Sequence, residues 1–162
     1  MWIELPALWI IVINCIGIPA VHLLVAWWST RLPARLFRPE AMLFRPRGWE
    51  SGGSLYARLF RVRSWNRLLP DAAPWFGGVA KAKITSRDTA YYRTFSVETC
   101  RGEFSHWVQL LVIAGFTAWN PYPFNLVIIG WSLLSNLPCI VNLRYVRARL
   151  QQIMVRSAKV KR

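Results

Sequence analysis

Glu103 and His106 are the residues of this chain whose types and spacing best suit proton-transfer chemistry. They lie three positions apart, so in a helix their side chains share one face. An imidazole, with an unperturbed pKa of about 6.5, accepts a proton near neutral pH. A neighbouring carboxylate orients such a ring and stabilises the imidazolium that forms. The spacing therefore predicts His106 as a general base and Glu103 as its orienting partner.

The same two residues also allow structural interpretations. Glu103 and His106 could form a hydrogen bond that serves only packing, or Glu103 could form an ion pair with a nearby arginine. A metal site is a weaker alternative, because the second Glu-x-x-His of a di-metal bundle is missing. The chain has no HExxH, no Gly-rich phosphate loop and no GxSxG. We therefore predict no bound metal and no resident cofactor.

Basic and apolar residues are segregated along the 162-residue chain. The sequence is 54% hydrophobic yet has a net charge of +14. All of its lysines and arginines lie between Arg31 and Arg101 or between Arg144 and Arg162. The uncharged gaps are typical of membrane segments, and the basic blocks are typical of cytoplasmic flanks. Juxtamembrane topology explains the positive charge, and no nucleic-acid-binding motif is present, so we expect no nucleic acid as a partner.

The pattern predicts an all-α integral membrane protein forming a single membrane domain, 1–162. Three transmembrane helices are expected, over 5–28, 104–119 and 123–142, with 89–142 forming a helical hairpin and 143–162 a basic cytoplasmic tail. Between the first two spans, 29–88 alternates arginines with bulky apolar residues, which is typical of amphipathic helices at a membrane interface. Its clearest helix is expected over 54–69. The positive-inside rule places the chain in the cytoplasmic membrane, with the N-terminus outside and the C-terminus in the cytoplasm.

A second polar set follows the last apolar stretch. Arginine clusters bind phosphates and carboxylates through bidentate forks, so this set predicts an anion pocket on the same membrane face as His106. Helix-to-helix hydrogen bonding and interfacial anchoring are the alternative interpretation. The candidates for binding a substrate or acyl donor are Arg101, Asn136, Asn142, Arg144, Tyr145, Arg147 and Arg149.

Three cysteines, Cys15, Cys100 and Cys139, lack metal-ligand spacing and form no CxxC. We expect reduced, packed thiols and no disulfide. Cys100 neighbours Arg101, but nothing else in the sequence marks it as a nucleophile.

The chain from Thr30 to Leu150 resembles the small membrane acyltransferases typified by glycosyl-4,4'-diaponeurosporenoate acyltransferase. The resemblance does not depend on any single sequence element. It is specific because several elements occur in the same order and the charges are segregated in the same way. The matching elements are Thr30-Arg31-Leu32-Pro33 with Phe37; Phe44, Trp49 and Glu50; Arg63-x-Trp65-x-Arg67; Leu69-Pro70-Asp71; Glu98-Thr99-x-Arg101-x-Glu103-x-x-His106-Trp107; Asn136-x-Pro138; and Arg144-Tyr145 with Arg147-x-Arg149-Leu150.

The resemblance implies transfer of a fatty acyl group, with acyl-CoA as co-substrate, to a sugar hydroxyl of a glycosylated carotenoid or related glycolipid among the membrane lipids. His106 would then deprotonate the hydroxyl, the arginines would bind the donor, and Asn136 or Asn142 would donate to the oxyanion. No activated serine is apparent, so direct attack is favoured over an acyl-enzyme. A small membrane methyltransferase or reductase, and a non-enzymatic membrane scaffold, are the alternative functions.

Overall fold

The structure, a computed structural model, describes residues 2–69, 75 and 88–160. Helices form all of the regular structure in these residues, as expected for an all-α protein. The helices longer than one or two turns are α1 (Ala7–Arg31), α4 (Thr89–Gly115) and α5 (Phe124–Val160). The short helices are α2 (Ser54–Leu59) and α3 (Val62–Trp65) with 3-10 turns at Ala34–Leu36, Gly48–Gly53, Asn66–Leu68 and Phe116–Ala118.

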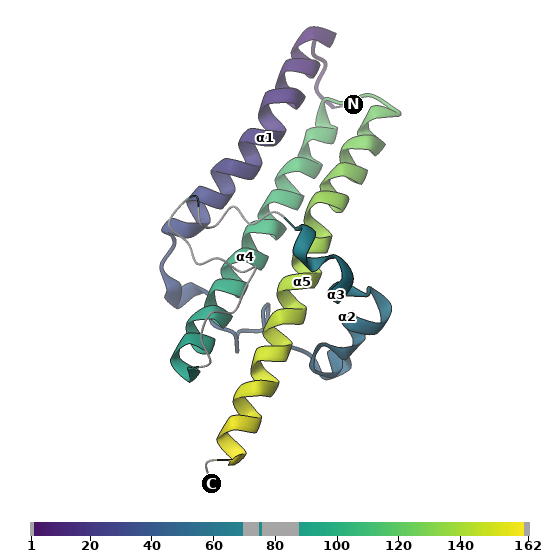
Figure 1. Cartoon of the computed structure of the whole chain (residues 1–162). Coiled ribbons are helices and arrows are strands. Elements are labelled where there is room, and N and C mark those ends of the chain that lie inside the picture. The colour runs from purple at the N-terminus through teal and green to yellow at the C-terminus, as the bar shows by residue number, and fades with distance from the viewer. Residues whose placement is uncertain (1, 70–74, 76–87, 161–162) are drawn as a thin grey trace.

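The three long helices form a bundle in which α4 lies against both α1 and α5 (Figure 1). Near the α4–α5 turn, Ile113, Phe116 and Ile128 form a buried apolar cluster. Gly17 allows the approach of α1, because a Cβ at that position would lie 3.0 Å from the Phe116 ring. Apolar packing therefore fixes the three helices at this end of the bundle.

Polar side chains join the helices at the same end. Asn14 of α1 donates to Asn120 Oδ1 (2.7 Å), and Asn120 Nδ2 donates back to Asn14 Oδ1 (3.2 Å). Trp119 Nε1 also donates to Asn14 Oδ1 (3.2 Å). The backbone N–H of Trp2 donates to the carbonyl of Ala118 (2.7 Å), so the start of the chain is tied to the turn.

Among the described residues, two helices are long and apolar enough to cross a membrane, Ala7–Arg31 and Phe124–Lys159. These correspond to the spans expected over 5–28 and 123–142. The span expected over 104–119 is not among them. The α-helix ends at Gly115, so its apolar part from 104 onward is about 18 Å long. That is shorter than the bilayer core of about 30 Å.

Helix α5 continues well beyond the expected end of its apolar span at 142. Residues 143–160 contain no glycine or proline, and they include helix formers such as Leu, Arg, Ala, Gln and Met. Leu143, Tyr145, Ala148 and Leu150 are buried, so this part of α5 belongs to the packed structure. The part expected to be a separate basic tail is therefore the second half of one long helix.

The interfacial region is built differently from the expected helix over 54–69. The helix breaks after Leu59, where Arg61 adopts a positive φ of 48°, and α3 restarts at Val62. Trp65 Nε1 donates to the carbonyl of Phe60 (2.7 Å) and stabilises the bend. Tyr56 and Val62 are buried against Tyr145, so α2 and α3 pack on the flank of α5 (Figure 1). Part of the 29–88 region, including Pro70 and Asp71, lies outside the described residues.

Candidate functional site

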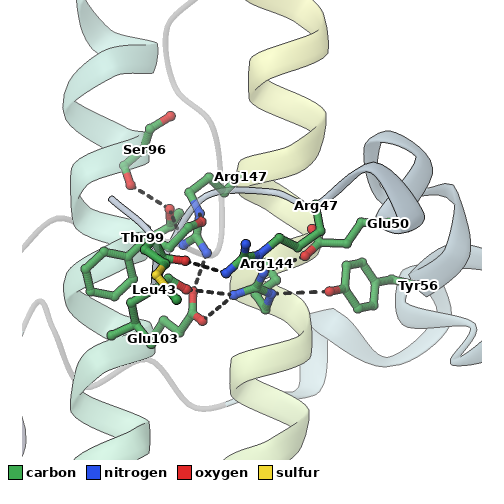
Figure 2. A network of polar contacts seen from close by, with 11 residues as sticks. Leu43, Arg47, Glu50, Tyr56, Ser96, Thr99, Glu103, Arg144 and Arg147 are labelled. Atoms are coloured by element: carbon green, nitrogen blue, oxygen red, sulfur yellow. Dashed lines mark hydrogen bonds and ion pairs between the residues drawn. The ribbon is translucent and has the colours of Figure 1, made fainter. Parts of the chain in front are cut away.

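The carboxylate of Glu103 lies between two arginines of α5. Glu103 Oε1 accepts from Arg144 (2.8 Å), and Glu103 Oε2 accepts from Arg147. The side chains of Glu103 and Arg147 are both fully buried. Figure 2 shows this ion-pair network between α4 and α5. The structure therefore confirms the alternative in which Glu103 pairs with an arginine.

Arg144 uses its remaining N–H groups on the segment that leads into α2. Its Nη2 pairs with Glu50 Oε1, its Nε donates to the Tyr56 hydroxyl (3.3 Å), and its Nη1 also donates to the carbonyl of Leu43 (3.2 Å). Burial raises the pKa of the Tyr56 phenol, which favours the neutral hydroxyl. Arg144 thus joins α4, α5 and the 43–56 segment.

Arg147 is held in the same way, with every nitrogen of its guanidinium engaged. Its Nε donates to the carbonyl of Phe44 (2.9 Å), and its Nη1 donates to Thr99 Oγ1 (3.4 Å). The guanidinium also lies near the Phe44 ring, 5.9 Å from its centroid. A buried guanidinium is tolerated when it is paired and hydrogen-bonded, and Arg147 meets both conditions. These contacts leave neither Arg144 nor Arg147 as an open anion-binding fork.

His106 takes a different partner from the expected one. Its Nδ1 lies 3.0 Å from Oδ1 of Asn136 on α5. Asn136 Nδ2 donates to the carbonyl of Ser132 (2.9 Å), and a carbonyl can only accept, so Oδ1 faces the ring. Asn136 is fully buried. The side chain that orients His106 at Nδ1 is therefore Asn136, whereas both carboxylate oxygens of Glu103 bind arginine.

Arg101 lies apart from the other candidate arginines. Its Nη1 donates to the carbonyls of Ser29 (2.7 Å) and Leu32 (2.6 Å) at the end of α1. Its Nε pairs with Glu98 (3.2 Å), and its guanidinium stacks over Phe37, 4.8 Å from the centroid. A cation is stabilised at a helix C-terminus by the helix dipole. Arg101 thus fixes the end of α1 to α4.

The remaining binding candidates lie on other faces of α5. The Tyr145 hydroxyl accepts from Arg63 Nε (2.9 Å), and Arg149 donates to Gln152 (3.2 Å). Asn142 Oδ1 is buried and has no hydrogen-bond partner among the described residues. The set expected to form a single pocket is therefore divided between the network, the His106 contact and the flank of α5 near α2 and α3.

Two features of the site were not expected from the sequence. Glu50 is fully buried and supplies the second carboxylate of the network. Its only signal was its place in the Phe44, Trp49 and Glu50 element. His22 Nδ1 lies 2.8 Å from Gln109 Oε1, which joins α1 to α4. The two histidines of the chain therefore contact side-chain amides on two different helices.

Cys100 lies beside the network but is a poor nucleophile. It is fully buried, and this burial raises the pKa of its thiol to about 11. Glu103 also raises the pKa, whereas Arg147 lowers it. The thiolate is therefore scarce at neutral pH.

Among the described residues there is also no group of three or more His, Cys, Asp and Glu side chains that could hold a metal ion.

Comparison with known proteins gives one family. Residues 39–156 match the family described as glycosyl-4,4'-diaponeurosporenoate acyltransferase. A protein of that name from Staphylococcus aureus (strain USA300) is 27% identical over 135 residues, which cover 83% of this chain and 81% of the relative. The proteins of the same name from strains bovine RF122 / ET3-1 and MRSA252 are each 26% identical over the same shares. No solved structure matches.

Proposed function

Because the chain belongs to the glycosyl-4,4'-diaponeurosporenoate acyltransferase family, we propose that it transfers a fatty acyl group from acyl-CoA to a sugar hydroxyl of a glycosylated carotenoid, with His106 as general base. This membership identifies the chain as an acyltransferase of a family that acts in carotenoid biosynthesis. The donor and the residue roles are the proposed part. The single observation that carries the role of His106 is its contact with Asn136 between α4 and α5.

The contact with Asn136 selects one tautomer of the ring. Because Asn136 Oδ1 is an acceptor, His106 Nδ1 carries the proton when the ring is neutral. The lone pair then lies on Nε2, which is the nitrogen that accepts a proton from a hydroxyl. A hydrogen bond at one ring nitrogen orients the other in catalytic histidines generally. Asn136 thus has the positioning role that the sequence suggested for Glu103.

The proposed reaction is direct transfer. The sugar oxygen attacks the carbonyl carbon of the acyl thioester while its proton moves to His106 Nε2. The C–S bond then breaks, the coenzyme A thiolate leaves, and the imidazolium returns the proton to it. The products are a sugar ester and free coenzyme A. General-base action of this kind is worth about 10² to 10⁴ in rate.

Glu103 lies about one turn before His106 on α4, and Arg144 and Arg147 of α5 hold it there. We propose that the network fixes α4 against α5 and so sets the distance between His106 and Asn136. Each arginine is engaged with protein acceptors, which favours a positioning role over donor binding. Arg101 would have a similar role toward α1.

The arrangement of the helices supports a multi-pass topology. Helices α1 and α5 begin at the same end of the bundle, and α4 packs against both (Figure 1). If α1 and α5 cross the membrane, the chain returns between them through the apolar half of α4 and the 3-10 turn Phe116–Ala118, which lie at the same depth. We propose that the N-terminus lies outside and the basic segments lie in the cytoplasm, as the positive-inside rule favours.

The test is acyl transfer by purified protein in nanodiscs, with palmitoyl-CoA and the glycosylated carotenoid acid as substrates and mass spectrometry of the ester. His106→Gln should lower kcat by about 10² to 10⁴. His22→Gln is the matched control, because His22 also contacts an amide but has no proposed part in proton transfer. Wild-type turnover by folded His106→Gln would refute the role of His106. Absence of the ester with the wild-type protein would refute the reaction.

A further inference from the structure

Two cavities adjoin each other on the flank of α5 where α2 and the Gly48–Gly53 turn pack. The smaller, of about 330 Å³, is lined by Arg58, Arg63 and Arg149 together with Tyr145. The larger, of about 480 Å³, is lined by Arg47, Arg156 and Lys159. Arg149, which lines the smaller cavity, donates to Gln152, which lines the larger (3.2 Å). The two cavities thus form one strongly cationic surface.

Within the part of the chain that the structure describes, no acidic side chain lines these cavities to balance their positive charge. Glu103 is the last acid of the sequence, so the rest of the chain after it offers no carboxylate. Glu50, Glu98 and Glu103 each pair with a different part of the arginine set, namely Arg144, Arg101 and Arg147 with Arg144. The described lining thus supplies no carboxylate to these cavities, which favours an anionic ligand there.

Two arginines of the smaller cavity, Arg63 and Arg149, each have a side-chain hydrogen bond that holds them in place. The Tyr145 hydroxyl accepts from Arg63 Nε (2.9 Å), which leaves the two Nη groups of that guanidinium for another acceptor. Gly53 lets the turn approach α5, because its φ is 88° and a Cβ there would lie 3.2 Å from the Tyr145 ring and carbonyl oxygen. Guanidinium forks fixed in this way suit the oxygen pairs of a phosphate.

We propose that these cavities hold the phosphates of the acyl donor, and that the donor is a coenzyme A thioester. This inference rests on the proposed function and names where its donor binds. Coenzyme A carries a diphosphate and a separate 3'-phosphate, which matches two adjoining cationic cavities. The binding arginines are then Arg58, Arg63 and Arg149, rather than Arg144 and Arg147 of the network.

The distance to His106 favours this donor over a phospholipid. Asn136, which contacts His106, precedes Tyr145 by nine residues and Arg149 by 13. At the helical rise these separations are about 14 and 20 Å along α5. Nine residues are two and a half turns, so the side chains point to opposite faces and the path is longer still. In a phospholipid the acyl ester lies only a few bonds from the phosphate, whereas the pantetheine arm of coenzyme A separates thioester and phosphate widely.

The experiment measures binding and kinetics in the same preparations. Coenzyme A is titrated calorimetrically into the full-length protein in nanodiscs of phosphatidylcholine, and KM and kcat are measured with palmitoyl-CoA. Arg63→Gln and Arg149→Gln should each weaken coenzyme A binding about tenfold, because each removes charge-assisted hydrogen bonds. KM should rise by a similar factor while kcat stays unchanged. Arg149→Lys, which keeps the charge but not the fork, should recover part of the affinity.

Arg93→Gln is the matched control, since Arg93 is exposed on α4 and lines neither cavity. It should bind coenzyme A as the wild type does. Unchanged affinity and KM in both cavity variants would overturn the cavity assignment. The cavity assignment would also be overturned if the variants differ from the wild type only in nanodiscs that contain phosphatidylglycerol, because the site would then serve a lipid headgroup. Cavity-dependent coenzyme A binding without any acyl transfer would instead count against the proposed reaction alone.

Discussion

Glu103 of α4 and Arg147 of α5 form an ion pair in which neither side chain is exposed to solvent. Arg144 shares the same carboxylate through its other oxygen (2.8 Å). Glu103 therefore bridges two guanidinium groups inside the protein, and Glu50 supplies the second carboxylate of the network. Removing one partner of such a buried pair leaves an uncompensated charge, which costs about 3 to 5 kcal/mol.

Glu103→Gln should therefore destabilise the protein strongly, by about 3 to 5 kcal/mol. The measurement is the apparent melting temperature in detergent, followed by intrinsic tryptophan fluorescence. Glu98→Gln is the control, because the Glu98–Arg101 pair is less buried than the Glu103 pair and Arg101 keeps two carbonyl acceptors without it, so the loss of stability should be smaller. Equal melting temperatures for the two variants would contradict the network's role in stability.

Asn136→Leu should lower kcat by at least about tenfold with little change in KM. Leucine has a similar volume but offers no acceptor to His106 Nδ1, so the ring loses its fixed tautomer. The matched control is Gln109→Leu, which removes the amide that contacts His22. That variant should keep kcat per folded protein. If both substitutions lower kcat equally, the Asn136 contact has no special place in the reaction.

Cys100 should resist alkylation in the folded protein. With a pKa of about 11, the thiolate is roughly one part in a thousand at pH 8, and the sulfur is buried as well. A variant carrying Cys15→Ser and Cys139→Ser isolates this thiol for maleimide labelling followed by mass spectrometry. Labelling should appear only after denaturation.

The reference for that measurement is Ser64→Cys in the same background, because Ser64 is exposed. Cys100 labelling at the rate of that reference would contradict the buried position. Cys100→Ser should also retain acyl transfer, since the proposed reaction is direct.

Arg101→Gln should loosen the segment that follows α1. The wild-type guanidinium donates to two carbonyls at the end of the helix, and hydrogen bonds from a charged group contribute about 1.5 to 3 kcal/mol each. Limited trypsin digestion should then cleave faster after Arg35, which is exposed and is followed by leucine. Arg93→Gln is the control for the loss of charge. Identical digestion of the two variants would show that Arg101 does not fix this segment.

The sequence was sufficient for the helical class and for two of the expected spans. Long uncharged stretches and segregated arginines predicted α1 and the first half of α5, because length and apolarity are local properties. Helix α5 continues beyond the expected end of its apolar span at 142, since loss of hydropathy does not end a helix whose residues favour helix and still pack. The helix expected over 54–69 was wrong at Arg61, where tertiary packing of Tyr56 and Val62 fixes a bend.

The residues of the candidate site could be named from the sequence, but their partners could not. Helical spacing placed Glu103 and His106 on a common face, yet the partner of each depends on how α4 crosses α5. The crossing brings Arg144 and Arg147 to Glu103, and Asn136 to His106. Glu50 enters the network from a segment 53 positions away from Glu103. No local pattern encodes that approach.

Helix α5 contains 37 residues, which is about 55 Å of rigid rod. It carries Asn136 beside the proposed reacting histidine and Arg149 beside the proposed phosphate cavities. Under this arrangement α5 would set a fixed distance between the phosphates of the donor and its thioester. Under the same proposal, the fatty chain would extend beyond the thioester toward the bilayer. Selection of the donor's carrier group and tolerance of its chain length are then separate properties of one helix.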